Sequence, residues 1–352
     1  MGPLSGVAPT AECAHSGTLK GVHVSADQRT SGPPVIETRA LTKRYGELVA
    51  LDALDLAVPE RSIVGFLGPN GAGKTTAMKL LIGLARPSGG SARVFDLDVT
   101  DRGPEVRARV GYLAQNPRFY EHYSARETLS FVARFFYDGP KAALERKIRE
   151  LLDLVGLEDK ADRPIRGFSG GERQRLGIAQ ANVNDPALLL MDEPAAALDP
   201  AGRRSVLEIL ERLRERTTVL FSTHILDDVQ RVADRVAILD HGRLVAHAPT
   251  RELLLGEGAA TFEVGVRGAA DAVTLALTAE PWVEAVETSQ DGGGHLLGVL
   301  VRDVEAAEAR LLRVALEVPG TVVTSFGRRS FGLEEVFLRL VDGHRTTARK
   351  RP

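Results

Sequence analysis

The sequence predicts an α/β protein in which helices cover a sheet of mixed strand direction. It also predicts an antiparallel β subdomain, a helical subdomain and a small C-terminal α+β domain. Short apolar strands alternate with helical segments between residues 62 and 240, which is typical of a sheet covered on both faces. Two segments with alternating apolar residues precede this region, at 35–45 and 49–60, and they suit antiparallel strands. A second strand and helix pattern follows it, from about residue 256.

The composition is that of a globular protein. The chain has 352 residues, of which 43% are hydrophobic and 26% charged, and this length allows two domains. A formal net charge of −2 gives no basic field, so no nucleic-acid partner is expected. The one cysteine, Cys13, excludes a disulfide framework and a cysteine zinc site. The sequence contains no run of about 18 apolar residues, so no membrane span is predicted. We expect residues 1–34 to form a disordered tail rather than a signal peptide.

Five apolar segments are the expected strands of the main sheet: 62–68, 110–115, 187–192, 217–224 and 235–240. Helical spacing is found at 74–84, near 202–214 and near 225–233. Residues 124–156 are also mostly helical in pattern, with "DGP" dividing them. We therefore expect one domain at 35–255, with a helical subdomain at about 116–170.

The C-terminal region predicts a separate accessory domain at 256–342. Its expected order is a strand at 261–267, a helix at 269–279, strands at 281–288 and 295–302, a helix at 304–316 and a strand at 320–326. That βαββαβ order is the ferredoxin-like signature. A further helix is expected in "LEEVFLRLVDG", and residues 343–352 form a basic tail.

A phosphate-binding loop follows the strand at 62–68. The segment "GPNGAGKTT" fits the pattern G-x-x-x-x-G-K-[ST], and it comprises Gly68, Pro69, Asn70, Gly71, Ala72, Gly73, Lys74, Thr75 and Thr76. Glycines let several backbone N–H groups face a phosphate, beside the N-terminus of a helix. Lys74 would contact the β- and γ-phosphates, Thr75 would bind Mg²⁺, and Thr76 would reach the α-phosphate.

Two adjacent carboxylates follow the strand at 187–192. Asp192 should lie at the carboxyl edge of the sheet, where α/β folds bind their ligands, and could hold Mg²⁺. Glu193 is then well placed to orient and polarise an attacking water molecule. The alternative is that this Asp-Glu pair only begins a polar loop.

With further motifs in the same order, residues 35–255 resemble the ATP-binding cassette (ABC) ATPases of membrane transporters, which have a P-loop NTPase fold. The resemblance implies ATP and Mg²⁺ as cofactors. It rests on the phosphate loop, the "LLLMDEP" strand and five further matches. Tyr45 matches the residue that stacks on adenine, Gln115 the sensor of Mg²⁺ and the γ-phosphate, and His224 the γ-phosphate switch. "FSGGE" matches the signature (Ser169, Gly170, Gly171, Glu172), and Asp199 lies in the loop that crosses the dimer interface. The resemblance thus assigns catalytic roles to Glu193, His224, Gln115 and Lys74, and metal contacts to Thr75, Gln115 and Asp192.

Two residues depart from the commonest family pattern. Phe168 replaces the usual leucine before Ser169, and we expect it to pack as an apolar side chain. Glu172 replaces the usual glutamine at the end of the signature. We expect its negative charge to lie near a bound triphosphate and to weaken its binding, unless the exchange is neutral.

The resemblance implies two partners. One is a second ATPase chain, most simply an identical one, whose phosphate loop faces the signature of the first across two bound ATP molecules. The other is a transmembrane permease at the cytoplasmic face of the membrane, contacted by the helical subdomain, where the aromatic segment 116–129 is either core packing or a contact surface. The C-terminal region resembles the ABC-2 type exporter branch, and its domain is either a dimerisation or regulatory module or a stabilising cap. An ABC importer and a non-transport ABC ATPase are the alternative functions.

Overall fold

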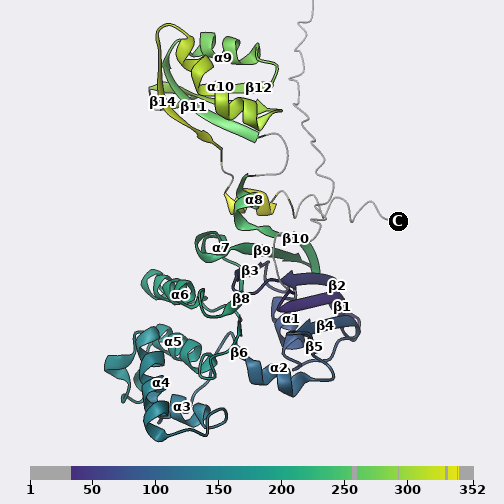
Figure 1. The fold of residues 1–352 in the computed structure, drawn as a ribbon, viewed down its shortest axis with the longest axis vertical. Helices are drawn as coiled ribbons and strands as arrows, with labels where there is room; N and C mark the ends of the chain where they lie inside the picture. The colour runs from purple at the N-terminus through teal and green to yellow at the C-terminus, as the bar shows by residue number, and fades with distance from the viewer. Residues whose placement is uncertain (1–32, 256–259, 292, 330–331, 339, 341–352) are drawn as a thin grey trace, which may run out of the picture.

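A computed structural model describes residues 33–255, 260–291, 293–329, 332–338 and 340 (Figure 1). The expected N-terminal tail lies outside the described residues up to position 32, and so does the basic tail at 343–352. The predicted start of the accessory domain, at 256, also falls in a part that the structure leaves undescribed.

The antiparallel β subdomain has four strands in the order β2-β1-β4-β5. Strands β1 (Ile36–Tyr45) and β2 (Leu48–Val58) pair as the sequence predicts. Strands β4 (Gly89–Val94) and β5 (Leu97–Asp98) were not predicted. Two glycines open β4, and in the sequence they favour a turn instead; pairing with β1 outweighs that local preference.

The central sheet has the strand order β10-β9-β3-β8-β7-β6. Its strands are β3 (Ile63–Leu67), β6 (Val110–Leu113), β7 (Leu188–Met191), β8 (Thr218–Thr223), β9 (Arg235–Asp240) and β10 (Arg243–Pro249). Five of them run parallel, and β10 pairs antiparallel at one edge, which confirms a mixed sheet. The carboxyl ends of β3, β8 and β7 therefore lie side by side, and this arrangement positions the site.

Two apolar cores sandwich the central sheet because successive strand residues point to opposite faces. On one face, Ile63 and Leu67 pack with helices α5 (Gly170–Ala181), α6 (Pro200–Leu213) and α7 (Leu226–Val232). On the other, Val64 and Phe66 pack with α1 (Lys74–Leu81) and the antiparallel sheet. Helix α1 ends at Leu81, three residues before the predicted end. Helix α2 (Gly103–Arg109) leads into β6.

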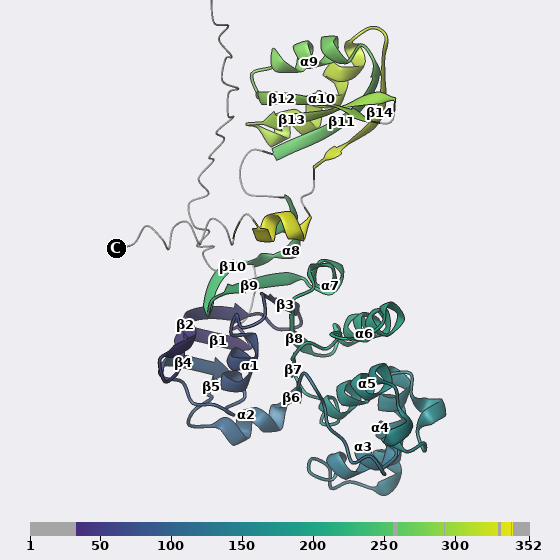
Figure 2. The ribbon, with the colours of Figure 1, turned by 180° about the vertical axis from the view of Figure 1, so that it is seen from behind.

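The helical subdomain contains α3 (Ala125–Ala133) and α4 (Lys141–Leu154), which pack with α5 (Figures 1 and 2). A break at 138–140 separates α3 from α4, as the sequence predicts. Phe168 is buried in this core, which confirms the expected apolar packing.

The accessory domain contains, in order, β11 (Ala260–Gly268), α9 (Ala270–Thr278), β12 (Val283–Asp291), β13 (Gly294–Val301), α10 (Val304–Glu317) and β14 (Thr321–Arg328). These strands form an antiparallel sheet in the order β12-β13-β11-β14. Both helices contribute to a separate apolar core beneath one face of the sheet.

After β14 the chain returns to the first domain. Residues 333–338 are helical and lie next to α8 (Thr250–Leu255), as Figures 1 and 2 show. Leu333 is 1% exposed and belongs to the apolar core of the first domain, with Phe337 and Leu340 packed against it. The backbone N–H of Leu333 donates to Gln230 Oε1 on α7 at 3.5 Å. The last described residues are thus part of the first domain's packing. Within the described parts of the chain, no helix is long and apolar enough to cross a membrane.

Leu333→Ala tests this packing. It should lower the free energy of unfolding by about 2–5 kcal/mol, because it removes a fully buried side chain and leaves a cavity. The matched control is Leu338→Ala on the same helix, where the side chain is 53% exposed and little change is expected. Chemical denaturation of both variants makes the comparison, and equal stabilities would contradict the docked position of residues 333–338.

Candidate active site

The phosphate loop lies between the buried strand β3 and the start of α1. Gly73 precedes α1 with φ of 104°, a conformation that L side chains rarely adopt. A Cβ atom there would lie 2.4 Å from the Ala50 carbonyl oxygen, so only glycine fits. The N–H of Gly242 donates to the Ala72 carbonyl at 3.0 Å, which ties the loop to the β9–β10 turn. The loop conformation is therefore fixed by its neighbours.

Lys74 is 6% exposed and its ammonium lies inside the mouth of the loop. Its Nζ donates to the Gly68 carbonyl at 2.6 Å and to the Pro69 carbonyl at 3.2 Å. The same Nζ lies 3.4 Å from Glu193 Oε1, so the lysine of the loop and the carboxylate after β7 form a buried ion pair. Sequence separation between these residues is 119, and the sheet order brings them together.

Asp192 and Glu193 are 1% and 5% exposed, and Ser222 of β8 binds both. The Ser222 hydroxyl donates to Asp192 Oδ1 at 2.6 Å and accepts from the Glu193 N–H at 2.9 Å. Glu193 has φ of 51°, which is uncommon for a residue with a Cβ atom. Strained backbone of this kind costs about 1–3 kcal/mol and clusters at functional sites. The hydrogen bond from the Glu193 N–H to Ser222 Oγ helps to hold Glu193 in this conformation.

His224 completes a chain of three ionisable groups. Its Nδ1 lies 2.8 Å from Glu193 Oε2, while the other carboxylate oxygen faces Lys74. The His224 side chain is 46% exposed, whereas Glu193 and Lys74 are almost fully buried. These two contacts fix the orientation of the Glu193 carboxylate, and geometry is the first requirement for a candidate general base.

The signature residues lie at the start of α5 and form a capping box. Ser169 Oγ accepts from the Glu172 N–H at 3.2 Å, and Glu172 Oε2 accepts from the Ser169 N–H at 2.7 Å. Lys160 Nζ is 2.9 Å from Glu172 Oε1. The hydrogen bond to Lys160 and that to the Ser169 backbone hold the pKa of the Glu172 carboxyl below its usual range.

This geometry adds two partners to the expectation for Glu172. The carboxylate is turned back to its own helix terminus and paired with Lys160. Both contacts stabilise the signature turn. The expected effect of its negative charge on a bound triphosphate stays a prediction.

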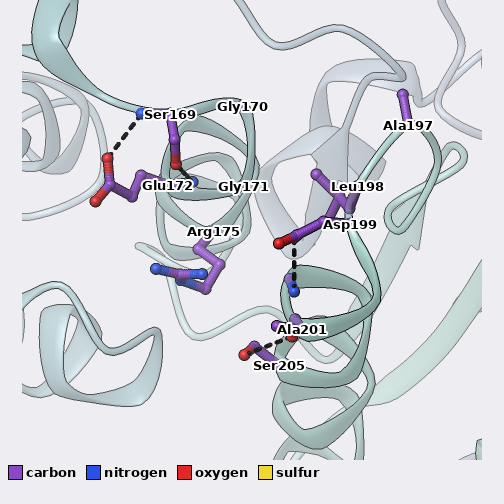
Figure 3. A pocket seen from close by; sticks show the side chains of 11 residues that line it. Ser169, Gly170, Gly171, Glu172, Arg175, Ala197, Leu198, Asp199, Ala201 and Ser205 are labelled. Atoms are coloured by element: carbon purple, nitrogen blue, oxygen red, sulfur yellow. Dashed lines mark hydrogen bonds between the residues drawn. The ribbon is translucent and has the colours of Figure 1, made fainter.

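Asp199 and the signature face each other across a cavity of about 430 Å³ (Figure 3). The Asp199 carboxylate accepts from the Gly202 N–H at 3.0 Å and so caps α6. Arg175 on α5 also lines this cavity. Its Nε is buried and has no hydrogen-bond partner among the described residues.

Four further predicted site residues form no side-chain hydrogen bond or ion pair with this cluster in the described part of the chain. Tyr45 is 49% exposed at the end of β1, with the Lys43 ammonium 4.8 Å from its ring centroid. Gln115 is exposed, two residues beyond β6. Thr75 and Thr76 are partly exposed in the first turn of α1.

The phosphate loop and the signature are two separate half-sites. In the described part of the chain, no hydrogen bond or ion pair joins residues 68–76 to residues 169–172. The chain therefore brings together Lys74, Asp192, Glu193 and His224 in one place, and Ser169, Gly171 and Asp199 in another.

Two contributors were missed in the sequence. Ser222 stands two positions before His224 in "STH", and the register of β8 beside β7 would have indicated it. Lys160 carries no local signal, because its proximity to Glu172 depends on the packing of 158–160 against the signature turn.

The comparisons identify the class to which this fold and site belong. Residues 51–196 match the family model described as ABC transporter. The chain is 40% identical over 316 residues to the daunorubicin/doxorubicin resistance ATP-binding protein DrrA of Streptomyces peucetius, covering 88% of this chain and 92% of that protein. It is 34% identical over 309 residues to the Nod factor export ATP-binding protein I of Ralstonia nicotianae, with coverage of 87% and 94%.

Solved structures agree on the first domain. A dimeric, post-hydrolysis structure of the ATP-binding cassette MJ0796 bound to ADP and phosphate has a TM-score of 0.57 and 26% identity, and covers 62% of this chain and 99% of that one. The structure of cbiO1 from Clostridium perfringens, part of the ABC transporter complex cbiONQ, has a TM-score of 0.59 at 24% identity, with coverage of 63% and 91%, and shares the fold. The chain belongs to the ATP-binding subunits of ABC transporters, and it is an ABC ATPase.

Glu172→Gln tests the assigned role of the signature carboxylate. It keeps a side chain that can close the capping box but removes the ion pair with Lys160, so the loss of unfolding free energy should be below about 1 kcal/mol. Because the pKa of Glu172 is lowered by folding, this loss should be present at pH 7 and disappear as pH falls below the usual carboxyl range.

The control is Glu127→Gln in the equivalent capping box of α3, where Ser124 is the cap and no ion pair to Glu127 is formed by the described residues. Urea denaturation at pH 7, and at a series of pH values down to below the usual carboxyl range, measures both variants. If Glu172→Gln raised the stability at pH 7, the charge would be repulsive and the assigned role would be contradicted.

Proposed function

We propose that two copies of this chain hydrolyse ATP at composite sites and so drive the closure of a membrane exporter. The observation that carries the proposal is the Glu193 carboxylate held between Lys74 and His224, beside Asp192, while the signature forms a second half-site elsewhere. One chain then supplies the phosphate loop and the other supplies the signature for each nucleotide.

In this proposal each group of the first half-site has one task. The loop N–H groups and the start of α1 bind the phosphates, and Lys74 exchanges its loop carbonyls for the β- and γ-phosphate oxygens. Tyr45 stacks on adenine with its exposed ring. Glu193 accepts a proton from the attacking water, and His224 orients Glu193 and contacts the γ-phosphate.

Mg²⁺ fits the residues present. Asp192 Oδ2 is buried and accepts no hydrogen bond from any described residue, so it is free to face a metal or a metal-bound water. Mg²⁺ usually takes one or two protein ligands together with phosphate oxygens and water, and Thr75 and Gln115 would complete such a set. When bound, it would neutralise charge on the β- and γ-phosphates.

The second half-site is supplied by an identical chain in this proposal. Ser169 holds the start of α5 so that the N–H groups near Gly170 and Gly171 face outward, toward a γ-phosphate of the partner. Asp199 lies on the opposite wall of the same cavity and would reach across the interface. A two-fold arrangement makes both sites equivalent. The dimeric MJ0796 cassette supports this geometry.

A permease is the proposed second partner, at the cytoplasmic face of a membrane. Exposed aromatic side chains cover the helical subdomain: Tyr120, Phe131, Phe135, Phe136 and Tyr137. Exposed aromatics of this density favour a protein contact over simple core packing. One relative is named for Nod factor export and another for daunorubicin/doxorubicin resistance, and both names support export. The ABC-2 branch is proposed from the resemblance of the C-terminal region. These observations favour an exporter over an importer or a non-transport ATPase.

The order of the elements along the chain supports two domains. We propose an ABC ATPase domain at 35–255 and an accessory domain that begins at 256; within the expected range of 256–342, the helical residues 333–338 pack on the first domain instead. The strand order β12-β13-β11-β14, together with the βαββαβ sequence of elements, supports a ferredoxin-like assignment of the accessory domain.

Glu193→Gln tests the catalytic assignment. ATP turnover should fall by about 10²–10⁴-fold because the general base is removed while the shape of the side chain is kept. ATP should then convert the variant into a stable dimer on size-exclusion chromatography. Turnover within a factor of two of the parent chain would exclude Glu193 as the base.

Lys74→Ala tests the phosphate site. Loss of a charge that contacts two phosphates should weaken ATP binding by at least about tenfold, since hydrogen bonds to charged groups contribute about 1.5–3 kcal/mol. Lys79→Ala is the matched control, because Lys79 is an exposed lysine in the last turn of the same helix. Calorimetric titration with ATP compares the two, and equal affinities would exclude Lys74 from the site.

A further inference from the structure

Two helices leave the site and are joined by a buried ion pair. Helix α6 begins at Pro200, directly after Asp199, and helix α7 begins two residues after His224. Arg203 lies about one turn into α6, and Asp228 lies in the first turn of α7. Arg203 Nε is 2.5 Å from Asp228 Oδ1, and the two side chains are 28% and 1% exposed.

Among the described residues, Arg203 is the one cation that compensates the charge of Asp228. Burial raises the pKa of the Asp228 carboxyl above its usual value, and the hydrogen bond from Arg203 opposes that rise. Asp228 Oδ2 is buried and has no hydrogen-bond partner within the described ranges. A buried ion pair of this kind contributes little to the stability of the fold, because two apolar side chains of similar volume in its place are often at least as stabilising. The pair is therefore better explained by a role in the site than by its contribution to folding.

The surroundings of the pair connect it with the composite site. A cavity of about 270 Å³ lies between α6 and α7, and Arg203 and Asp228 line it together with Leu198, Pro200, Arg204, Leu207, Asp227 and Arg231. Leu198 also lines the larger cavity that contains Ser169 and Asp199. Leu198 thus joins the two cavities, and the Arg203–Asp228 pair joins the start of α6 to α7.

At the other end, α7 begins two residues after His224. The Ile225 N–H donates to Thr223 Oγ1 at 2.9 Å, so the connection between β8 and α7 is short and bonded. His224 Nδ1 is in turn 2.8 Å from Glu193. A shift of about 1 Å in a group that orients a catalytic residue can change the rate by about a hundredfold.

We propose that Arg203 and Asp228 are a positioning pair that couples the Asp199 segment to His224 and Glu193. When the partner subunit closes on the cavity that contains Asp199, the pair holds α7 so that His224 keeps Glu193 in register with the attacking water. Each chain would then hydrolyse its own ATP at the full rate only while its Asp199 segment is engaged with the partner. The inference rests on the composite site proposed above.

The test compares Arg203→Gln, Asp228→Asn and the double variant by steady-state ATPase kinetics and by calorimetric ATP titration. Each single change should lower kcat by about tenfold or more, with less than a twofold change in ATP affinity, because the phosphate contacts are untouched. The double variant should be no slower than either single variant, since both changes break one link. Arg212→Gln is the control: Arg212 lies further along α6 and pairs with Asp153 on the surface, so kcat should stay at the parent value.

Arg203→Lys keeps a cation beside Asp228 and serves as the second variant if Arg203→Gln does not fold. It should retain folding but lose part of kcat, because lysine cannot reproduce the fixed guanidinium geometry. In the Glu193→Gln background, Arg203→Lys should still allow the ATP-dependent dimer, since closure does not need the pair.

Three results would overturn the inference: a normal kcat in folded Arg203→Gln, a fall in ATP affinity that matches the fall in kcat, or effects of the two single changes that multiply in the double variant. Normal turnover in Glu193→Gln alone would instead reject the proposed site. The two failures are therefore distinguishable.

Discussion

The structure of the site depends on one buried carboxylate. Glu193 is 5% exposed, and its two oxygens are shared between the Lys74 ammonium and His224. An ionised carboxylate removed from water is unfavourable unless it is paired and hydrogen-bonded. This constraint requires the phosphate loop, the end of β7 and the end of β8 to meet, and the strand order β3-β8-β7 brings them together. Ser222 then fixes the unusual backbone at Glu193 and binds Asp192 at the same time.

In the proposed function, the same groups exchange partners when a nucleotide binds. Lys74 is bonded to carbonyl oxygens of its own loop and to Glu193, so phosphates would compete with contacts that already satisfy the ammonium. Release of Glu193 from Lys74 would leave its carboxylate to act on water, with His224 still in place. Substrate binding and activation of the proposed base would then be one event. The second half-site is held by helix caps and not by a buried ion pair. A capping box fixes the start of α5, and the Asp199 carboxylate caps the start of α6.

Much of this could be predicted from the sequence, because it depends on local chemistry. The phosphate loop needs glycines and a lysine at fixed spacing, and the buried strands are continuous apolar runs. The βαββαβ order of the accessory region could also be predicted, since its strands and helices have clear periodicity. Strand β4 was missed because its two opening glycines favour a turn, and only pairing with β1 makes them extended.

Long-range contacts could not be predicted. The compensation of Glu172 by Lys160, the pair formed by Arg203 and Asp228, and the return of Leu333 to the first domain all depend on tertiary packing. Glu172 shows the consequence most clearly. Its negative charge is evident from the sequence, but the groups that its carboxylate contacts depend on the fold. The pair between α6 and α7 likewise carries no local signal, although both residues stand within five positions of a recognised motif.

The exchange of partners at Lys74 is the central claim, and a crystal structure of the Glu193→Gln variant with Mg²⁺ and ATP tests it most directly. The account predicts that Lys74 Nζ leaves the Gly68 carbonyl and residue 193 for phosphate oxygens, and that Asp192 Oδ2 gains a metal ion or a metal-bound water as its partner. It also predicts Ser169 of a second chain within hydrogen-bond distance of the γ-phosphate. A structure in which ATP is bound while Lys74 keeps its loop carbonyls and Asp192 Oδ2 stays without a partner would contradict the account.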